Sequence, residues 1–317
     1  MLLILSNSQD ATVAYLVPHL ETASIPYVRI DTDTILDDLR FTFTPSEPIL
    51  NFGGGSYSPN DFEVIWYRRP ESLVSKIANG TPESKYGLDE WTEALEGFLA
   101  HVPVTKWMNH PSANAFASHK IEQLSTALRL GFLIPPSLVT QNADSLKEFY
   151  SQHSGKIIAK PLSTGLIEEP DTGTVSLIYT SRVRESDLQY LQDLNVCPTL
   201  FQKELDKEFD VRITVVDKSI HAVKLRAVDS PRSQRLDIRR DNMHDVDYET
   251  CELPPEVTSL ILALMNYYGL RFAAIDMAVT KSGEWHYFEI NPNGQWAWLD
   301  TAAGLNIASS FLRSFKN

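Results

Sequence analysis

The sequence predicts a mixed α/β (α+β) fold with more than one lobe. Two patterns indicate it: a strand–helix–strand alternation opens the chain, and two apolar strands joined by a short polar turn lie near its end. The chain has 317 residues, 43% of them hydrophobic and 22% charged, which is ordinary for a globular protein. A chain of this length can bury enough apolar surface for two or three packed lobes.

The charge balance and the cysteines narrow the class of protein. The chain has 28 Lys+Arg against 41 Asp+Glu, a formal net charge of -13, which argues against a dedicated nucleic-acid binder. Its 2 Cys have no Cys or His at metal-ligand spacing, so we expect reduced thiols. We see no signal peptide and no apolar run near the ~20 residues that span a bilayer. We therefore predict a cytoplasmic protein without membrane contact.

Residues 1–108 are predicted to form an N-terminal α/β domain. Strands at 2–5 and 26–30 enclose a helix capped by Asp10, a βαβ unit that predicts a parallel sheet. The glycines at 53–55 lie between two β-prone stretches and favour a hairpin turn over a phosphate loop. A strand at 64–67 and a helix over 83–101 follow.

Residues 109–205 and 206–317 are predicted to form a central and a C-terminal domain. In the central part we expect one helix from Ser112 to about Leu130, followed by short strands and helices. The last part alternates apolar strands with one helix. The expected strands there are 210–216, 220–228, 272–279 and 285–290, and the expected helix is 255–268.

Three oxygen-bearing side chains fall in the last two predicted strands. Asp276 lies in the middle of one apolar strand, and Glu289 and Asn291 share a face of the next because side chains alternate along a strand. If the strands pair antiparallel, Asp276 lies beside them. Two carboxylates and an amide suit Mg²⁺. The alternative is that Asp276 or Glu289 pairs with an arginine.

Two lysines are placed to meet anionic groups. Lys160 ends an apolar strand and is followed by a Ser-Thr-Gly turn, and Lys120 lies near a helix start. A lone lysine is most often a solvated surface residue, but the apolar strand favours Lys160 as a point charge for phosphate oxygens.

A connector and two charged strands complete the candidate residues. The connector 200–205 has backbone groups for an adenine edge and apolar side chains for its faces. Asp210 and Arg212 share one strand face, and Lys224 and Arg226 share a face of the next strand. Together they predict a basic wall for a carboxylate or phosphate, with ordinary cross-strand ion pairs as the alternative.

Taken in order, these elements resemble the ATP-grasp ligases of the glutathione-synthetase-like branch. Three stretches are similar to the graspetide synthetases, the microviridin-type maturases of ribosomal peptides: 66–70, 109–111 leading to Lys120, and above all Glu289 to Trp296. The likeness covers nearly the whole chain. It implies an ATP-grasp fold with an N-terminal pre-ATP-grasp domain, a central domain and a C-terminal ATP-grasp domain that holds the metal site.

The resemblance implies an ATP-dependent peptide macrocyclase that uses ATP and Mg²⁺. ATP phosphorylates an Asp or Glu side chain of a precursor peptide, and a Ser or Thr hydroxyl or a Lys amine attacks the acyl phosphate to give an ester or an amide. A leader segment of the precursor docks on the central domain, and the enzyme is a homodimer.

The resemblance also implies roles for individual residues. The metal ligands are Asp276, Glu289 and Asn291. The ATP contacts are Lys120, Lys160, Thr164, Gly165, Gln202, Lys203, Glu204, Leu205, Glu208 and Asp210. The groups that receive the substrate carboxylate or the phosphoryl group are Arg212 and Arg226, and the substrate-binding residues are Tyr67, Arg68 and Arg69.

Two other functions remain open. The first is an ATP-dependent carboxylate–amine ligase acting on a small acid or a protein tail, which needs the same ATP site. The second is a nucleotide-binding module without turnover. The Tyr67–Pro70 stretch and the pair Trp296 and Trp298 favour the peptide maturase, and the two acids in apolar strands argue against a mere scaffold.

Overall fold

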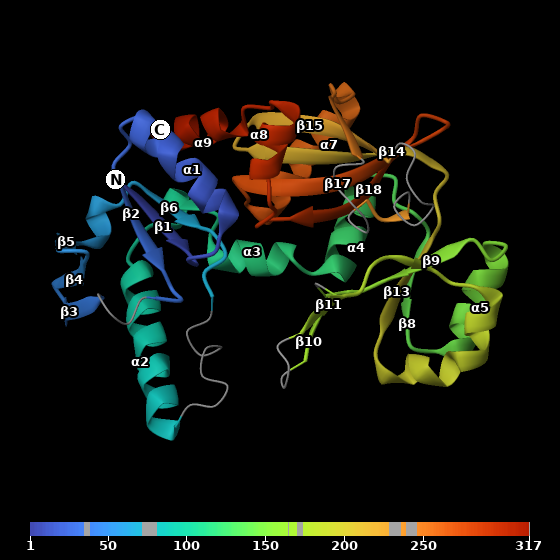
Figure 1. Cartoon of the computed structure of the whole chain (residues 1–317), viewed down its shortest axis with the longest axis horizontal. Coiled ribbons are helices and arrows are strands. Elements are labelled where there is room, and N and C mark those ends of the chain that lie inside the picture. The colour runs from blue at the N-terminus through green and yellow to red at the C-terminus, as the bar shows by residue number, and fades with distance from the viewer. Residues whose placement is uncertain are drawn as a thin grey trace.

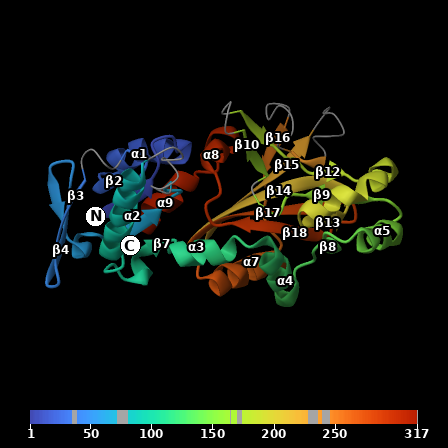
Figure 2. The same ribbon diagram turned by 90° about the horizontal axis from the view of Figure 1, so that it is seen from below.

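The computed structural model describes residues 1–34, 39–71, 81–163, 165–169, 174–227, 236–238 and 246–316. Within this part of the chain, three lobes follow one another along the long axis of the molecule (Figure 1). The five-stranded C-terminal sheet lies between the N-terminal lobe and the lobe formed by the central residues (Figure 2). The domain boundaries at 108 and 205 stay a prediction.

The N-terminal lobe is built on a parallel sheet of order β2-β1-β6-β7, as the opening βαβ pattern predicts. Its elements are β1 (Leu2–Ser6), α1 (Ala11–Thr22), β2 (Tyr27–Asp31), β6 (Val64–Tyr67), α2 (Pro82–Leu99) and β7 (Trp107–Met108). The Asp10 carboxylate caps α1 by accepting from the Thr12 and Val13 amides. Every residue of β1 is buried, because neighbours pair on both its edges and side chains cover both its faces.

A small antiparallel sheet lies at the outer side of this lobe. Its strands are β3 (Arg40–Thr44), β4 (Glu47–Phe52) and β5 (Gly55–Tyr57). Gly53 and Gly54 join β4 to β5 with φ angles of +55° and +77°, which L-residues with a side chain rarely adopt. The predicted hairpin is confirmed.

The central residues form an antiparallel sheet of order β12-β9-β13-β8 and a projecting hairpin, β10 with β11 (Figure 1). The elements are β8 (Ser137–Thr140), α5 (Ala143–Gln152), β9 (Ile157–Lys160), β10 (Leu166–Glu168), β11 (Val175–Leu177), β12 (Ser181–Arg182) and β13 (Thr199–Lys203).

The single helix expected from Ser112 to Leu130 is wrong. The structure has two helices, α3 (Pro111–Ala117) and α4 (Lys120–Leu130), with an extended His119 between them. The Ser118 hydroxyl donates to the Asn114 carbonyl at 2.7 Å, a local bond that competes with helix continuation. The break makes Lys120 the first residue of α4.

The C-terminal lobe is an antiparallel sheet of order β16-β15-β14-β17-β18. Its elements are β14 (Lys207–Val216), β15 (Ser219–Ala227), β16 (Val246–Thr250), α7 (Pro255–Tyr268), β17 (Phe272–Thr280), β18 (Trp285–Asn291), α8 (Ala297–Ala303) and α9 (Ile307–Lys316). The sequence did not indicate β16, a short edge strand with alternating acids. No described helix is long and apolar enough to cross a membrane.

The two faces of this sheet have different partners. One face packs against α7 and α4 through a cluster that includes Val211, Ile213 and Ile261. The other face contributes Val223 and Phe272 to a core shared with the N-terminal lobe. Helices α7 and α8 accordingly lie on opposite sides of the sheet (Figure 2).

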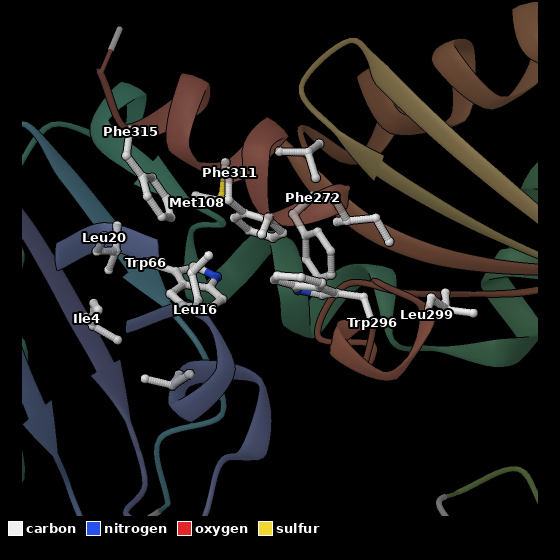
Figure 3. Close-up of a cluster of buried hydrophobic side chains, with 14 of the residues drawn as sticks. Ile4, Leu16, Leu20, Trp66, Met108, Phe272, Trp296, Leu299, Phe311 and Phe315 are labelled. Atoms are coloured by element: carbon white, nitrogen blue, oxygen red, sulfur yellow. The ribbon is translucent and has the colours of Figure 1, made fainter. Parts of the chain in front are cut away.

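The shared core joins the first and last parts of the chain. Trp296 stacks on Phe311 with ring centroids 4.7 Å apart, and Phe311 lies 5.3 Å from the ring of Trp66 in β6 (Figure 3). Of the tryptophan pair taken to favour a peptide maturase, Trp296 cannot itself contact a peptide, because its side chain is 0% exposed. Trp296 is a core residue that fixes the segment after β18.

We predict that Trp296→Ala lowers the free energy of unfolding by about 3–5 kcal/mol, the usual cost of removing a buried aromatic side chain. Urea unfolding followed by circular dichroism measures it. The matched control is Tyr86→Ala on α2, where the side chain is 65% exposed, and there we expect a change within about 0.5 kcal/mol. Equal losses in the two variants would contradict the shared core.

Candidate active site

A cleft of about 820 Å³ lies where the three lobes meet. The N-terminal lobe contributes Arg69, and the C-terminal sheet contributes residues of all five strands. The predicted site residues that line the cleft are Arg69, Lys120, Lys160, Gln202, Asp210, Arg212, Asp276, Glu289 and Asn291. The structure therefore brings together half of the residues singled out from the sequence.

The predicted oxygen set forms on the pair β17–β18. Asp276 stands directly opposite Glu289 in the antiparallel register, and Asn291 follows two residues later. The predicted arginine alternative is also present, since Arg212 Nη1 donates to both Asp276 carboxylate oxygens at 2.8 Å. Lys120 Nζ lies 3.5 Å from Glu289 Oε2. Both acids stay about one-third exposed (33% and 32%), so their remaining lone pairs face the cleft.

The chemistry of this donor set fits Mg²⁺. Two carboxylates and one amide offer hard oxygen ligands, and nucleotide phosphates supply the others in sites of this kind. Among the described residues no group of three or more His, Cys, Asp and Glu could hold a metal ion by itself. A metal at this place would depend on a phosphate ligand.

The two lysines occupy the side of the cleft formed by the central residues. Lys120 Nζ donates to the Pro161 and Ser163 carbonyls at 3.0 and 3.3 Å, which ties α4 to the segment after β9. Lys160 Nζ lies 4.3 Å from the centroid of the Phe288 ring, and no carboxylate in the described residues forms an ion pair with it. Burial lowers the pKa of Lys160 to about 8.

Arg68 does not contact the cleft, which corrects its predicted role in substrate binding. Its side chain is 0% exposed, and its Nε lies 3.2 Å from the equally buried Asp10. The same guanidinium donates to the Asn293 carbonyl, to the Gly294 carbonyl at 3.1 Å and to Gln295 Oε1 at 2.9 Å. Arg68 thus ties the N-terminal lobe to the loop after β18.

The neighbours of Arg68 behave differently. Arg69 has a positive φ of 50°, lines the cleft and donates from Nε to the Asn293 carbonyl at 2.8 Å. Burial lowers its pKa. Tyr67 does not line the cleft; its ring lies 6.3 Å from that of Trp107. Of the three residues predicted to bind substrate, only Arg69 is in a position to reach it.

Arg212 is held by the same loop. Its Nη2 donates to the Gln295 carbonyl at 3.2 Å, while its Nε is buried without a partner. A Cβ on Gly294 would lie 2.9 Å from Arg212 Nη2 and 2.2 Å from the Ala274 Cβ. Only glycine at 294 leaves room for the guanidinium beside the loop.

The predicted basic wall does not form, so the roles of Arg226 and Glu208 are corrected. Arg212 stands opposite Val223, and Val211 stands opposite Lys224, so Lys224 and Arg226 point to the face opposite Arg212. Arg226 lies 3.4 Å from Glu208 and over the Phe209 ring instead. A bulge at Glu208 breaks the alternation that would place it beside Asp210.

The connector and the following strand surround the inner end of the cleft. A small adjoining hollow is lined by Gln202, Lys203, Glu204, Leu205 and others. Arg182 Nε donates to Glu204 Oε2 at 2.7 Å. Lys207, which the sequence analysis missed, donates to Asp210 at 2.6 Å. Residues three apart in a regular strand point to opposite faces, and the β-bulge between Lys207 and Phe209 brings these two side chains together, so no local pattern signals the pair. Burial raises the pKa of Asp210.

The turn after Lys160 contributes less than predicted. Gly165 has a φ of +72° and is buried against Pro161, and it does not line the cleft. Thr164 lies outside the described residues. Gln295 entered the sequence analysis only as a member of the stretch that ends at Trp296, yet it lines the cleft. It accepts hydrogen bonds from both Arg68 and Arg212.

Solved structures match this chain over nearly its full length. It is similar to the macrocyclase MdnC of Microcystis aeruginosa MRC bound with precursor peptide MdnA (TM-score 0.85, 25% identity, 100% of this chain and 99% of that one). It is also similar to a Chryseobacterium gregarium RiPP-associated ATP-grasp ligase in complex with ADP and a leader and core peptide (TM-score 0.84, 27% identity, 98% of this chain and 94% of that one).

A third similar structure is the macrocyclase MdnB of the same Microcystis strain (TM-score 0.76, 27% identity, 98% of this chain and 97% of that one). No protein-family model matches the sequence, and a search of curated proteins finds no match. The chain has the ATP-grasp fold, and its neighbours are RiPP ATP-grasp ligases.

We predict that Gly294→Ala lowers the free energy of unfolding by about 1–3 kcal/mol, because the new methyl group overpacks Ala274 and Arg212. Thermal unfolding measures the loss. Gly97→Ala in α2 is the matched control, since a Cβ there meets nothing within 4 Å and the added helix propensity is favourable. A neutral Gly294→Ala would show that the loop does not pack against Arg212 as described.

The pKa of Lys160 predicts a pH dependence of nucleotide binding. Below about pH 8 the ammonium is charged in the free protein, and the affinity for Mg-ATP does not depend on this group as the pH changes. Above it, a triphosphate that needs the charged form must draw in a proton, so affinity falls with rising pH. Calorimetry at pH 9 in two buffers of different ionisation enthalpy measures the uptake. We expect Lys160→Gln to abolish the proton uptake, and Lys281→Gln, at an exposed position, to keep it. Binding without proton uptake in the unaltered protein would refute the role of Lys160.

Proposed function

We propose that this chain, an ATP-grasp ligase by fold, is an ATP-dependent macrocyclase of a ribosomally made precursor peptide. The observation that carries the proposal is the meeting in one cleft of three kinds of group: the lysines Lys120 and Lys160, two arginines, and the paired acids Asp276 and Glu289. The neighbours bound to precursor peptides and nucleotide support it.

The reaction couples an acid to a nucleophile in two steps. A carboxylate oxygen of a peptide Asp or Glu attacks the γ-phosphorus of ATP, and ADP leaves. A Ser or Thr hydroxyl or a Lys amine then attacks the carbonyl carbon of the acyl phosphate, loses a proton, and phosphate leaves with the ester or amide formed. Such chemistry asks the protein mainly for alignment and charge neutralisation.

The residues divide these tasks. Lys120 and Lys160 neutralise phosphate oxygens, and the connector Gln202–Leu205 with Asp210 holds the nucleoside. When bound, Mg²⁺ held by Asp276, Glu289 and Asn291 supplies further positive charge to the phosphates. Desolvation of Lys160 strengthens its attraction to phosphate, because the interaction is less screened than in water.

Arg212 and Arg69 receive the acidic side chain of the peptide. Their charges are close enough that Arg212 contributes to lowering the pKa of Arg69. A carboxylate between the two relieves this repulsion. The remaining N–H groups of the two guanidiniums can donate charged hydrogen bonds to one carboxylate from two sides, which fixes the attacking oxygen.

The finer expectations about partners rest on the family resemblance. We propose that a leader segment of the precursor accompanies the reactive core, and that the enzyme works as a homodimer in the cytoplasm. Size-exclusion chromatography with light scattering tests the oligomeric state.

The experiment is co-expression with each short reading frame that flanks the gene, followed by intact peptide masses. We expect one flanking peptide to lose one water per cross-link. Glu289→Gln, which removes a metal-ligand charge, should slow this by about 100-fold or more. Glu284→Gln is the matched control, because it changes an exposed acid outside the cleft and should keep the activity.

One outcome would overturn the role of Glu289, and another would overturn the proposed function. Equal water loss with Glu289→Gln and with the unaltered protein would remove the proposed role of Glu289. If no flanking peptide loses water while the protein still binds Mg-ATP, a small-acid ligase becomes the leading function.

A further inference from the structure

The cleft face of the C-terminal sheet changes character from one edge to the other. Strands β17 and β18 contribute Asp276, Glu289 and Asn291 together with Met277 and Phe288, and β14 contributes Lys207, Asp210 and Arg212, so every charged side chain that the sheet turns to the cleft comes from these three strands. On β15 and β16 the cleft-facing residues are Leu225, Val246 and Tyr248. Five strands thus present a charged half and an uncharged half to one cavity.

The register explains why no charge from β15 or β16 reaches the cleft. Leu225 stands opposite Asp210 on one side and Tyr248 on the other, so these three side chains share the cleft face. The charged residues of the two strands alternate with them and point away, where Lys224 pairs with Glu249. The pleat separates the uncharged floor from a charged outer face.

Helix α8 completes this end of the cleft. Trp298 and Ala302 line the cavity, and the Trp298 ring lies 5.6 Å from Tyr248 at an interplanar angle of 67°. Trp298 is half-buried, whereas its neighbour Leu299 is 0% exposed and anchors the helix in the shared core (Figure 3). An aromatic corner is therefore held rigidly beside an apolar floor.

This uncharged end lies on the far side of Arg212 from the phosphate-binding lysines. Lys160 contacts Phe288 of β18, at one edge of the sheet, while Tyr248 belongs to β16, at the other. Neighbouring strands are about 4.8 Å apart, so an acid bound at Arg212 on β14 has the apolar floor within one or two strand spacings. A residue next to that acid in an extended peptide reaches this distance.

We propose that Leu225, Val246, Tyr248, Trp298 and Ala302 form a subsite for an apolar side chain adjacent to the acid that is activated. This inference rests on the proposed function and deepens it, because it assigns the enzyme a sequence preference beside the reactive Asp or Glu. The subsite is continuous with the charged centre. Leu225 and Val246 are only 5% and 4% exposed, so the surface that a bound side chain covers belongs mainly to Tyr248, Trp298 and Ala302. Covering this surface favours an aliphatic or aromatic residue over a polar one by about 10–100-fold in affinity.

The test uses acetylated, amidated peptides Gly-X-Glu-X-Gly, with X as Phe, Leu, Ser or Asp, added to the full chain with ADP and Mg²⁺. The chain has 6 tryptophans, so fluorotryptophan labelling gives a small set of fluorine NMR signals, and Trp298→Phe identifies the signal of Trp298. We expect the Phe and Leu peptides to shift this signal and to bind about 10–100-fold more tightly than the Ser and Asp peptides.

Two controls make the test specific. The signal of Trp91, which is half-buried on α2 and packs against the core of the N-terminal lobe away from the cleft, should not move. Tyr248→Ala should bring the affinity ratio of the Phe and Ser peptides close to one, whereas Tyr86→Ala, at a 65% exposed position on α2 outside the cleft, should keep the preference for Phe. Equal affinity of the Phe and Ser peptides, or a Trp298 signal that no peptide moves, would overturn the subsite.

A parallel reaction with ATP and hydroxylamine separates this proposal from the proposed function. Hydroxylamine attacks the acyl phosphate carbonyl and releases phosphate, which leaves a peptide hydroxamate. Hydroxamate from all four peptides at equal rates upholds carboxylate activation and overturns the subsite. A shifted Trp298 signal without any hydroxamate upholds the subsite and contradicts the activation.

Discussion

The buried ion pair between Arg68 and Asp10 is the interaction on which the cleft depends. Both side chains are removed from water, at 0% and 1% exposure, and a buried charge left without its partner costs about 3–5 kcal/mol. Arg68 uses its other donors on the backbone of Asn293 and Gly294 and on the Gln295 side chain. One guanidinium thus holds the N-terminal lobe to the loop after β18, the strand that carries the proposed metal ligands Glu289 and Asn291.

The arrangement of the cleft follows from that loop. Its carbonyls accept from three arginines, Arg68, Arg69 and Arg212, so a short stretch of backbone sets the positions of the two guanidiniums that face the cavity. Arg212 in turn orients Asp276 at the centre of the sheet. From this centre the cleft face becomes acidic toward β18 and apolar toward β16. The proposed chemistry and the proposed side-chain preference both depend on the position of Arg212.

The local periodicity of the sequence predicted much of the arrangement of the cleft. The alternation of side chains along a strand placed Glu289 and Asn291 on one face, and the polar turn at 281–284 correctly implied an antiparallel partner carrying Asp276. Features fixed by distant contacts were missed. Arg226 follows a charged residue at a spacing of two, as Arg212 does, but it lies on the other face of the sheet. The face depends on the register between the paired strands, which the spacing does not reveal. The burial of Arg68 and Trp296 depends on segments more than two hundred residues away, which no local pattern reveals.

Transfer of carboxylate oxygen tests the central claim most directly. A substrate peptide whose reactive Asp or Glu carboxylate is enriched in oxygen-18 is turned over with ordinary ATP in ordinary water. If the cleft activates the acid as an acyl phosphate, each bond formed releases inorganic phosphate carrying one heavy oxygen from the peptide. If the phosphate is unlabelled, its fourth oxygen came from water. In that case the enzyme hydrolyses ATP without activating the carboxylate, contrary to the mechanism proposed here.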